Sequence, residues 1–281
     1  MLKLRKMTKK KSPGEDLRSV LGEVDVPTFP TPVIKSLEAL RCPDSAANDV
    51  AAALGMDPGL TVRLLKLVNS AGFSPAKPVN SVDQAVAVAG FGAVESLVLS
   101  VGVSAVLPKR QVEGYDQARF WRTASRRATI ARAFATELHP ATSSLSFTAG
   151  LLQDMAVPML AVAREDYRPL LVEWHNGGED LHQLEEETFN WEHGDVAEWL
   201  CREWELPQAL AEAISAHHHT GDSLAPPGVQ LAAPFREEER PDIREQVITR
   251  ANEEFGLQPD RVETMIEEAE RDAVEVAGLF I

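Results

Sequence analysis

The sequence predicts an all-α protein, and three observations support this prediction. Apolar residues recur at helical spacing, as Leu60, Leu64 and Leu67 do. Helix-start signals precede several of these runs, for example Asp57 as an N-cap with Pro58 at the first helical position. The chain has no run of alternating β-branched residues of the kind that forms strands, and no short tandem repeat. Its 281 residues suffice for one large domain or two modest ones.

The first part of the chain is expected to form five helices. A Pro-rich segment precedes a short amphipathic helix over 33–40, and two further helices lie within 48–68. A Ser-x-x-Gln capping box opens the helix over 81–90. The fifth helix, over 91–107, is almost entirely apolar and ends before Pro108, which cannot continue a helix.

A polar, Gly-bearing stretch over 108–116 predicts a boundary between two lobes. The first lobe is predicted over 25–108 and the second over 109–281. Within the second lobe, residues 220–242 hold four prolines and a charge cluster, which predicts a flexible Pro-rich loop. The helices of this lobe are expected over 117–138, 146–163, 166–176, 181–190, 193–206, 207–219, 243–255 and 259–279.

Charge is distributed unevenly along the chain. The first eleven residues carry six basic groups and no acidic group, whereas the remainder carries 22 basic and 43 acidic residues. Residues 1–24 are therefore predicted to be a basic, disordered tail that solubilises the protein, with contact to nucleic acid or an anionic membrane as the alternative. The acidic remainder would be repelled by phosphate backbones, so nucleic acid is not an expected partner.

The sequence predicts a cytoplasmic protein without a membrane span. The basic start is not followed by the apolar region of a signal peptide. Cys42 and Cys201 show no paired spacing, as expected in a reducing compartment. The apolar stretch 85–107 is interrupted by Glu95 and by glycines, which favours two buried helices over a transmembrane segment.

Five segments in order resemble one family. They are "DPGLTVRLLKLVNSAGF" (57–73), "FW" (120–121), "FTAGLLQDMA" (147–156), "HGDVAEWLCREWELP" (193–207) and "AISAHHH" (213–219). Together they are similar to the HDOD family, a bacterial relative of the HD-domain metal-dependent phosphohydrolases, from about residue 25 to residue 281.

The resemblance implies two helical lobes, of which the C-terminal one is shaped like an HD phosphohydrolase. It also implies a function, because members of the family act as output or scaffold modules in bacterial signalling. No receiver-like α/β segment occurs in this chain, so the expected function is that of a stand-alone regulatory module that binds a protein partner. The partner surface is expected on one face or in the groove between the lobes. The acidic residues Glu263, Glu267, Glu268 and Glu270 form either part of that surface or a solvated face.

The resemblance also locates a hydrolase site whose residues have changed. An HD hydrolase holds its metal with an adjacent His-Asp pair, an earlier His and a later Asp. This chain has Gln153 and Asp154 at the pair, and the earlier His position falls on or near Thr123. Val157 replaces the lysine that related enzymes have three residues after the pair, and no later Asp can be aligned within 220–242. Amide and hydroxyl oxygens are poorer metal ligands than imidazole, so we expect no catalytic residues, no metal and no cofactor.

A residual site is the enzymatic alternative. Asp154, His193, His217 and His218 are the remaining candidate ligands, and they would make a weak metal-dependent phosphohydrolase. Because successive helical residues point about 100° apart, His217, His218 and His219 cannot all reach one ion. The same residues also fit a buried polar network, or a pocket that binds phosphate or a nucleotide without turnover.

DNA binding is the second alternative. Residues 48–68 form two short helices joined near Gly55, which is superficially similar to a helix-turn-helix. The second helix offers only Thr61, Arg63 and Lys66 as polar contacts, and it begins at an acidic residue. We therefore rank DNA binding below the other two functions.

Overall fold

The computed structural model describes residues 20, 26–70, 75, 77–219, 223–236 and 242–281. Its helices confirm the all-α prediction, and the described residues hold one isolated bridge, between Val112 and Tyr115, as their β-structure. The predicted tail 1–24 lies outside the described residues, apart from Val20.

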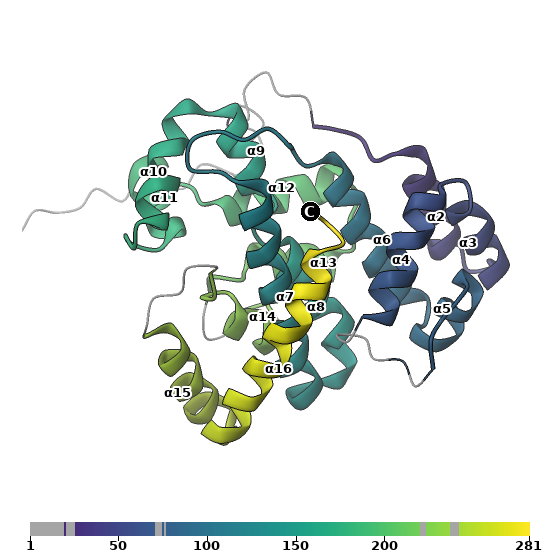
Figure 1. Ribbon diagram of the computed structural model, residues 1–281. Coiled ribbons are helices and arrows are strands. Elements are labelled where there is room, and N and C mark those ends of the chain that lie inside the picture. Colours follow the sequence, from purple (N-terminus) through teal and green to yellow (C-terminus); the bar gives the residue numbers. More distant parts are fainter. Residues whose placement is uncertain (1–19, 21–25, 71–74, 76, 220–222, 237–241) are drawn as a thin grey trace, which may run out of the picture.

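Helices α2 to α6 form one side of the molecule (Figure 1). The apolar stretch near residue 95 folds as two helices, α5 and α6, as predicted. Helix α6 is buried along most of its length and packs on α8 of the other side. Trp204 also links the two sides, because its Nε1 donates to the carbonyl of Pro27 at 2.9 Å. The bounds are α2 (Thr31–Arg41), α3 (Ala47–Leu54), α4 (Pro58–Asn69), α5 (Val82–Ala89) and α6 (Phe91–Val106).

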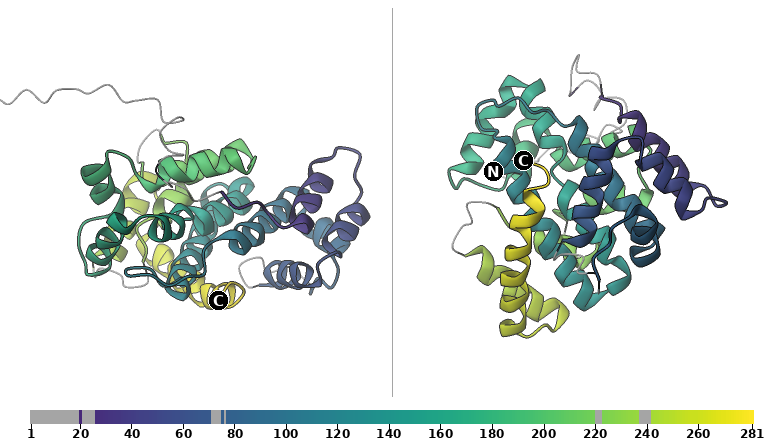
Figure 2. Two further views of the ribbon diagram at one scale, coloured as in Figure 1. Left: turned by 90° about the horizontal axis from the view of Figure 1, so that it is seen from above. Right: turned by 45° about the vertical axis from the view of Figure 1, so that its right-hand side comes forward.

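The other side is built around one long central helix, α7 (Gln117–Leu138), against which α8, α14 and α16 pack (Figure 2). Asp116 caps the start of α7 by accepting from the backbone N–H of Arg119 at 2.7 Å. The remaining helices are α8 (Ser143–Leu152), α9 (Ala156–Ala163), α10 (Arg168–His175), α11 (Leu181–Phe189), α12 (His193–Glu203), α13 (Gln208–Ser215), α14 (Pro227–Ala232), α15 (Ile243–Phe255) and α16 (Pro259–Ala277). The domain boundary at 108–109 stays a prediction.

The helix predicted over 146–163 is interrupted at residues 153–155, which form a turn between α8 and α9. The N–H groups of Met155 and Val157 donate three residues back, to Leu152 and Asp154, at 2.9 Å each. Pro158 explains the break, since it has no N–H to donate to the Asp154 carbonyl and its ring would clash with that carbonyl. The break places Asp154 in a turn.

One stretch of the described residues, Pro140–Ala163, is long and apolar enough to cross a membrane by length and composition. However, 89% of its apolar window is buried inside the fold, as expected for a core segment.

The predicted loop over 220–242 contains a buried helix, α14, so the loop prediction is wrong for this part. Pro227 begins the helix, where proline needs no hydrogen bond. Gly228 lets it approach α7 closely, because an added Cβ would lie 2.3 Å from the carbonyl oxygen of Ala131. Residues 220–222 and 237–241 lie outside the described residues.

Candidate functional site

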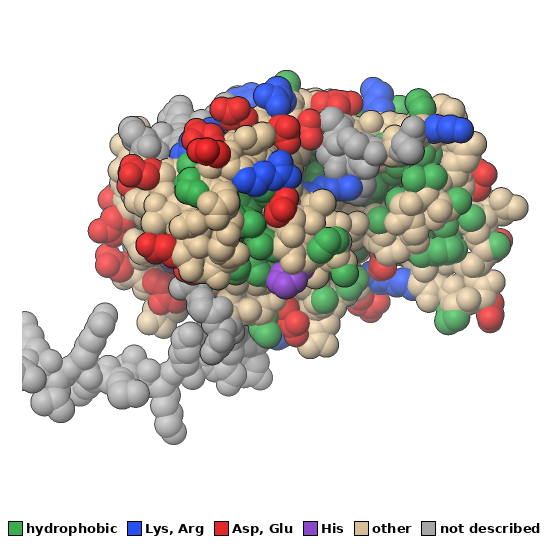
Figure 3. All heavy atoms as spheres, turned by 90° about the horizontal axis from the view of Figure 1, so that it is seen from below, with side chains coloured by type: hydrophobic (Ala, Val, Ile, Leu, Met, Phe, Trp, Pro, Cys, Tyr) green, Lys and Arg blue, Asp and Glu red, His purple; other side chains and the backbone are tan. Residues whose placement is uncertain are grey.

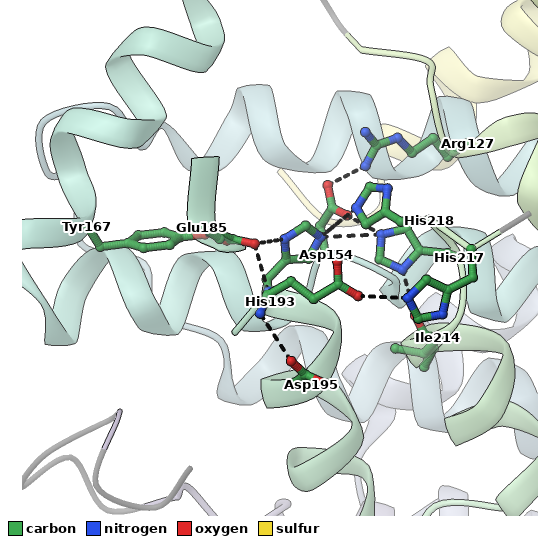
Figure 4. Close-up of polar contacts among 11 residues, drawn as sticks. Arg127, Asp154, Tyr167, Glu185, His193, Asp195, Ile214, His217 and His218 are labelled. Atoms are coloured by element: carbon green, nitrogen blue, oxygen red, sulfur yellow. Dashed lines mark hydrogen bonds and ion pairs between the residues drawn. The ribbon is translucent and has the colours of Figure 1, made fainter. Parts of the chain in front are cut away.

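The structure brings together the four residues that the sequence singled out as residual ligands (Figure 4). Asp154 comes from the turn between α8 and α9, His193 is the first residue of α12, and His217 and His218 follow α13. Asp154 and His193 are 8% and 1% exposed, so their charges must be balanced within the protein.

Arg127 supplies a positive charge that the sequence analysis missed. Its Nη1 donates to Asp154 Oδ2, and its Nε donates to the carbonyl of Phe235 at 2.6 Å. The Arg127 side chain is 3% exposed, so this is a buried ion pair with a fixed geometry. The guanidinium stands beside Asp154, one of the candidate metal ligands of the sequence analysis.

A second carboxylate, Glu185 of α11, holds His193 in place. Its Oε2 accepts from the backbone N–H of His193 at 2.8 Å and from the Nδ1–H of the same residue at 2.7 Å. Its Oε1 accepts from the hydroxyl of Tyr167. Glu185 is fully buried, so all its hydrogen bonds come from the protein.

The imidazole rings meet through their Nε2 atoms. The Nε2 of His193 lies 3.3 Å from that of His217 and 3.1 Å from that of His218. Asp154 Oδ1 lies 3.5 Å from the Nε2 of His193 and of His217, and makes no hydrogen bond of normal length. His217 donates its Nδ1–H to the carbonyl of Ile214 at 2.6 Å. His219 is 65% exposed and lies outside this cluster, 3.5 Å from Glu192.

The buried charges shift the pKa values of the cluster in opposite directions. Burial alone would raise the pKa of Asp154, but Arg127 and the two imidazoles hold it well below its usual range. Burial would lower the pKa of His193, but Glu185 and Asp154 raise it to about 10. Burial lowers the pKa values of His217 and His218. Of these three rings, His193 is thus the one whose pKa favours the protonated form.

A pocket of about 140 Å³ opens beside the cluster. His182 of α11 lines it, with its ring centroid stacked 4.1 Å from that of His218, and burial lowers the pKa of His182 to about 4. Gln230 of α14 also lines the pocket, in the segment where a hydrolase would supply its later Asp. Basic side chains outnumber acidic ones in the lining, which includes Arg127, Arg236, Arg250, Asp154 and Asp180.

Three positions that the sequence analysis assigned to a hydrolase site lie away from the pocket. Thr123, Gln153 and Val157 are buried, and none of them lines the pocket. Neither polar atom of the Gln153 amide has a hydrogen-bond partner. The histidine cluster does fit one ion, because the ligand atoms of His193, His217 and His218 lie within 4.8 Å of one another. Two of the rings also direct their Nδ1–H groups at acceptors, as metal-binding histidines do.

The helix-turn-helix alternative loses one of its three polar contacts. The hydroxyl of Thr61 donates to the carbonyl of Leu54 at 2.9 Å and so joins α4 to α3. Arg63 and Lys66 are exposed on α4, beside the exposed Val62. Two cationic side chains next to an apolar one offer few hydrogen bonds with which to recognise base edges.

Comparisons with known proteins identify one family through a family model and one fold through solved structures. A protein of Treponema pallidum described as uncharacterized is 27% identical over 197 residues, which are 69% of this chain and 38% of that protein. The chain therefore spans less than half the length of this relative. The HDOD domain model matches residues 26–220.

Solved structures show the same architecture. A protein from Shewanella amazonensis described as a phosphohydrolase has a TM-score of 0.70 and 21% identity, covering 95% of this chain and 99% of that one. An HDOD domain protein with unknown function from Geobacter sulfurreducens has a TM-score of 0.66 and 21% identity, covering 94% and 95%. A protein from Marinobacter aquaeolei described as acting in signal transduction has a TM-score of 0.67 and 17% identity, covering 95% and 65%. Because the HDOD domain model matches most of its length, this chain belongs to the HDOD domain family.

Proposed function

We propose that this chain is a signal-transduction module that acts by binding a protein partner and does not hydrolyse phosphoesters. Membership of the HDOD family and the likeness to a protein described as acting in signal transduction fit a signalling module. The binding of a partner and the lack of hydrolysis are our proposal.

The ion pair between Arg127 and Asp154 is the observation that carries the proposal. A hydrolase needs the Asp154 carboxylate to hold a metal ion, which activates water and polarises a phosphoryl oxygen. Here Asp154 Oδ2 accepts from a guanidinium that is itself anchored to the Phe235 carbonyl. A guanidinium stays charged at physiological pH and has no open coordination position, so it cannot activate water.

The test is a hydrolysis assay on untagged protein. Bis-p-nitrophenyl phosphate would be incubated with the chain and added Mn²⁺, Fe²⁺ or Zn²⁺, and nitrophenol release followed. We expect no release above that of the metal ions alone. Release that Asp154→Asn and His193→Gln both abolish, in variants with unchanged circular dichroism, would overturn the proposal.

A second candidate function is metal binding at the histidine cluster, and the orientation of its rings favours it. The Nε2 atoms of His193, His217 and His218, with Asp154 Oδ1, would hold one divalent transition-metal ion. Such an ion would supply Lewis acidity and a bound water of lowered pKa. The chain's own residues would orient it, since Glu185 fixes the His193 ring and Ile214 fixes the His217 ring.

Metal content separates the two candidates. Untagged protein would be purified without chelator and its zinc, iron and manganese measured per chain by elemental analysis. The proposed function predicts a content far below one equivalent. A content near one equivalent that His218→Gln removes would establish metal binding instead.

A further inference from the structure

The outer side of α4 carries positive charge beside an apolar side chain. Successive helical residues point about 100° apart, so Val62, Arg63 and Lys66 share one side of α4. The buried residues Leu64 and Leu67 lie on the opposite side. Val62 is 50% exposed, and both cations are exposed. Neither cation makes a side-chain hydrogen bond or an ion pair with another residue that the structure describes. We name Val62, Arg63 and Lys66 the α4 face.

The outer side of α16 carries the opposite charge. Glu263, Glu267 and Val274 follow one another at intervals of four and seven residues, so they share one side of the helix. Val274 is 76% exposed, and both glutamates are exposed. Within the described part of the chain, neither glutamate makes an ion pair. Arg271, which is also exposed, adds a positive charge at the edge of this side. We name Glu263, Glu267 and Val274 the α16 face.

The two faces belong to parts of the chain that differ in charge. Residues 26–110, which include α4, carry seven basic and six acidic side chains, whereas residues 111–281, which include α16, carry 14 basic and 33 acidic ones. Figure 3 shows Lys and Arg side chains beside hydrophobic ones at its upper right, over the helices that include α4. At its upper left, over α15 and α16, Asp and Glu side chains stand among Lys and Arg ones. The α4 face of one molecule therefore attracts the α16 face of another, although the chain has a net charge of −15.

Both helices lie on the same side of the molecule. In Figure 1 they are on the side that faces the reader, and in the view from above in Figure 2 that side forms the lower edge. When two molecules pack with these sides together about a two-fold axis, α4 of each can meet α16 of the other. The same contact is then made twice and the assembly closes as a dimer.

We propose that this chain forms a two-fold dimer in which the α4 face of each copy packs against the α16 face of the other. Val62 packs against Val274, and the two cations of the α4 face pair with the two glutamates of the α16 face. The dimer goes beyond the proposed function and does not depend on it.

Other acidic occupants would use the α4 face alone. An acidic segment of a different protein, or DNA, would pair with Arg63 and Lys66 and leave the α16 face in solvent. The glutamates of the α16 face separate these cases, because only a second copy brings them against the cations.

Sedimentation velocity of the untagged full chain tests whether the dimer forms. The wild-type chain is expected to sediment as a dimer at about 0.05 M salt, and its dissociation constant should rise by about tenfold or more at about 0.5 M salt, because salt screens surface charges. A chain that stays monomeric at about 100 µM in the lower salt would overturn the proposal. A dimer that added salt does not weaken would also overturn it.

Exchange of charges tests which faces meet. One variant combines Arg63→Glu with Lys66→Glu, and the other combines Glu263→Lys with Glu267→Lys. All four residues are exposed, so the fold should tolerate the changes. Each variant alone has two faces of like charge and should be monomeric. Mixed in equal amounts, the two variants should form a heterodimer, because each acidic face then meets a basic one.

A third variant, Glu186→Lys with Glu187→Lys, is the control for the exchange. It makes the same change of charge at two exposed residues of α11, outside both faces, and should dimerise as the wild type does. Dimerisation of either exchanged variant alone, or a mixture of the two that stays monomeric, would sink the pairing of the α4 face with the α16 face.

The dimer and the proposed function fail separately. A monomeric chain whose α4 face binds DNA, with binding lost in Arg63→Glu and Lys66→Glu, would give that face to DNA and contradict the dimer. Phosphodiester hydrolysis that depends on Asp154 would contradict the proposed function, whatever the oligomeric state.

Discussion

The Nε2 atoms of His193 and His217 face each other at 3.3 Å, deep in the protein. His193 directs its Nδ1–H at Glu185, and His217 directs its Nδ1–H at the Ile214 carbonyl. Two neutral rings in these tautomers would oppose their Nε2 lone pairs, so a positive charge on one of the rings would stabilise the pair. A proton on His193 Nε2 supplies this charge. With it, two carboxylates (Asp154 and Glu185) balance two cations (Arg127 and His193), and the buried cluster is neutral.

The protonated state of His193 predicts how stability depends on pH. Its pKa of about 10 in the folded protein is above the value near 6.5 expected when unfolded. The stability that it contributes is fully present below about pH 6.5 and is lost as the pH rises towards 10. We expect urea midpoints of the wild-type chain to fall between about pH 7 and about pH 9.5, and those of His193→Gln to fall less. His219→Gln, at an exposed imidazole, is the control. An equal change of the urea midpoint with pH in all three proteins would show that His193 is neutral.

His182 should make the stability of the fold depend on pH in the opposite direction. Burial lowers its pKa to about 4, so its contribution is present above about pH 6.5 and is lost as the pH falls towards 4. Wild-type stability should therefore decrease between about pH 6.5 and about pH 4, and His182→Phe should reduce this decrease. Denaturation with urea at the two pH values measures the effect. An unchanged decrease in His182→Phe would assign the acid sensitivity to other groups.

Removal of Asp154 should destabilise the fold. Asp154→Ala leaves the buried charge of Arg127 without its partner, and we expect a loss of about 3–5 kcal/mol in the free energy of unfolding. Asp166→Ala is the matched control, because the Asp166 side chain is 58% exposed and its ion pair with Arg164 should contribute at most about 1 kcal/mol. Equilibrium denaturation measures both. An Asp154→Ala protein as stable as the control variant would mean that the pair does not stabilise the fold.

The fold was predictable because its signals are local. N-caps such as Asp57 and Ser81 mark where helices begin, and both accept the expected backbone hydrogen bonds. The two departures have local causes as well. Pro158 breaks the helix after Leu152, and the pair of prolines at 226–227 reads as a loop although it begins α14. Proline marks an interruption in a sequence without saying whether a loop or a new helix follows.

The candidate site was only partly predictable. Asp154 and the histidines stood out because they are titratable residues within apolar or His-rich segments. Arg127 lies in an Arg-Arg pair that reads as an exposed helix face, and Glu185 lies in an acidic run. Burial of Arg127 depends on α7 packing against α8 and α14, and burial of Glu185 depends on its contact with His193. Contacts between distant segments of this kind leave no local pattern.

The close crossing of α14 over α7 should tolerate no added side chain at Gly228. A Cβ there would lie 2.3 Å from the Ala131 carbonyl oxygen and 3.1 Å from the Ala135 nitrogen, so α14 would have to move away from α7. That movement would also displace the Phe235 carbonyl that Arg127 binds, since Phe235 follows α14 closely. We expect Gly228→Ala to cost about 1–3 kcal/mol in the free energy of unfolding.

Gly92→Ala is the control for this prediction, because nothing lies within 4 Å of an added Cβ in the helical position it occupies in α6. Alanine favours a helix over glycine, so this variant should be as stable as the wild type or more stable by up to about 1 kcal/mol. Urea denaturation of the two variants measures the difference. Equal stabilities would mean that α14 can move from α7 at little cost, and Arg127 would then lack the rigid support that its fixed pairing with Asp154 requires.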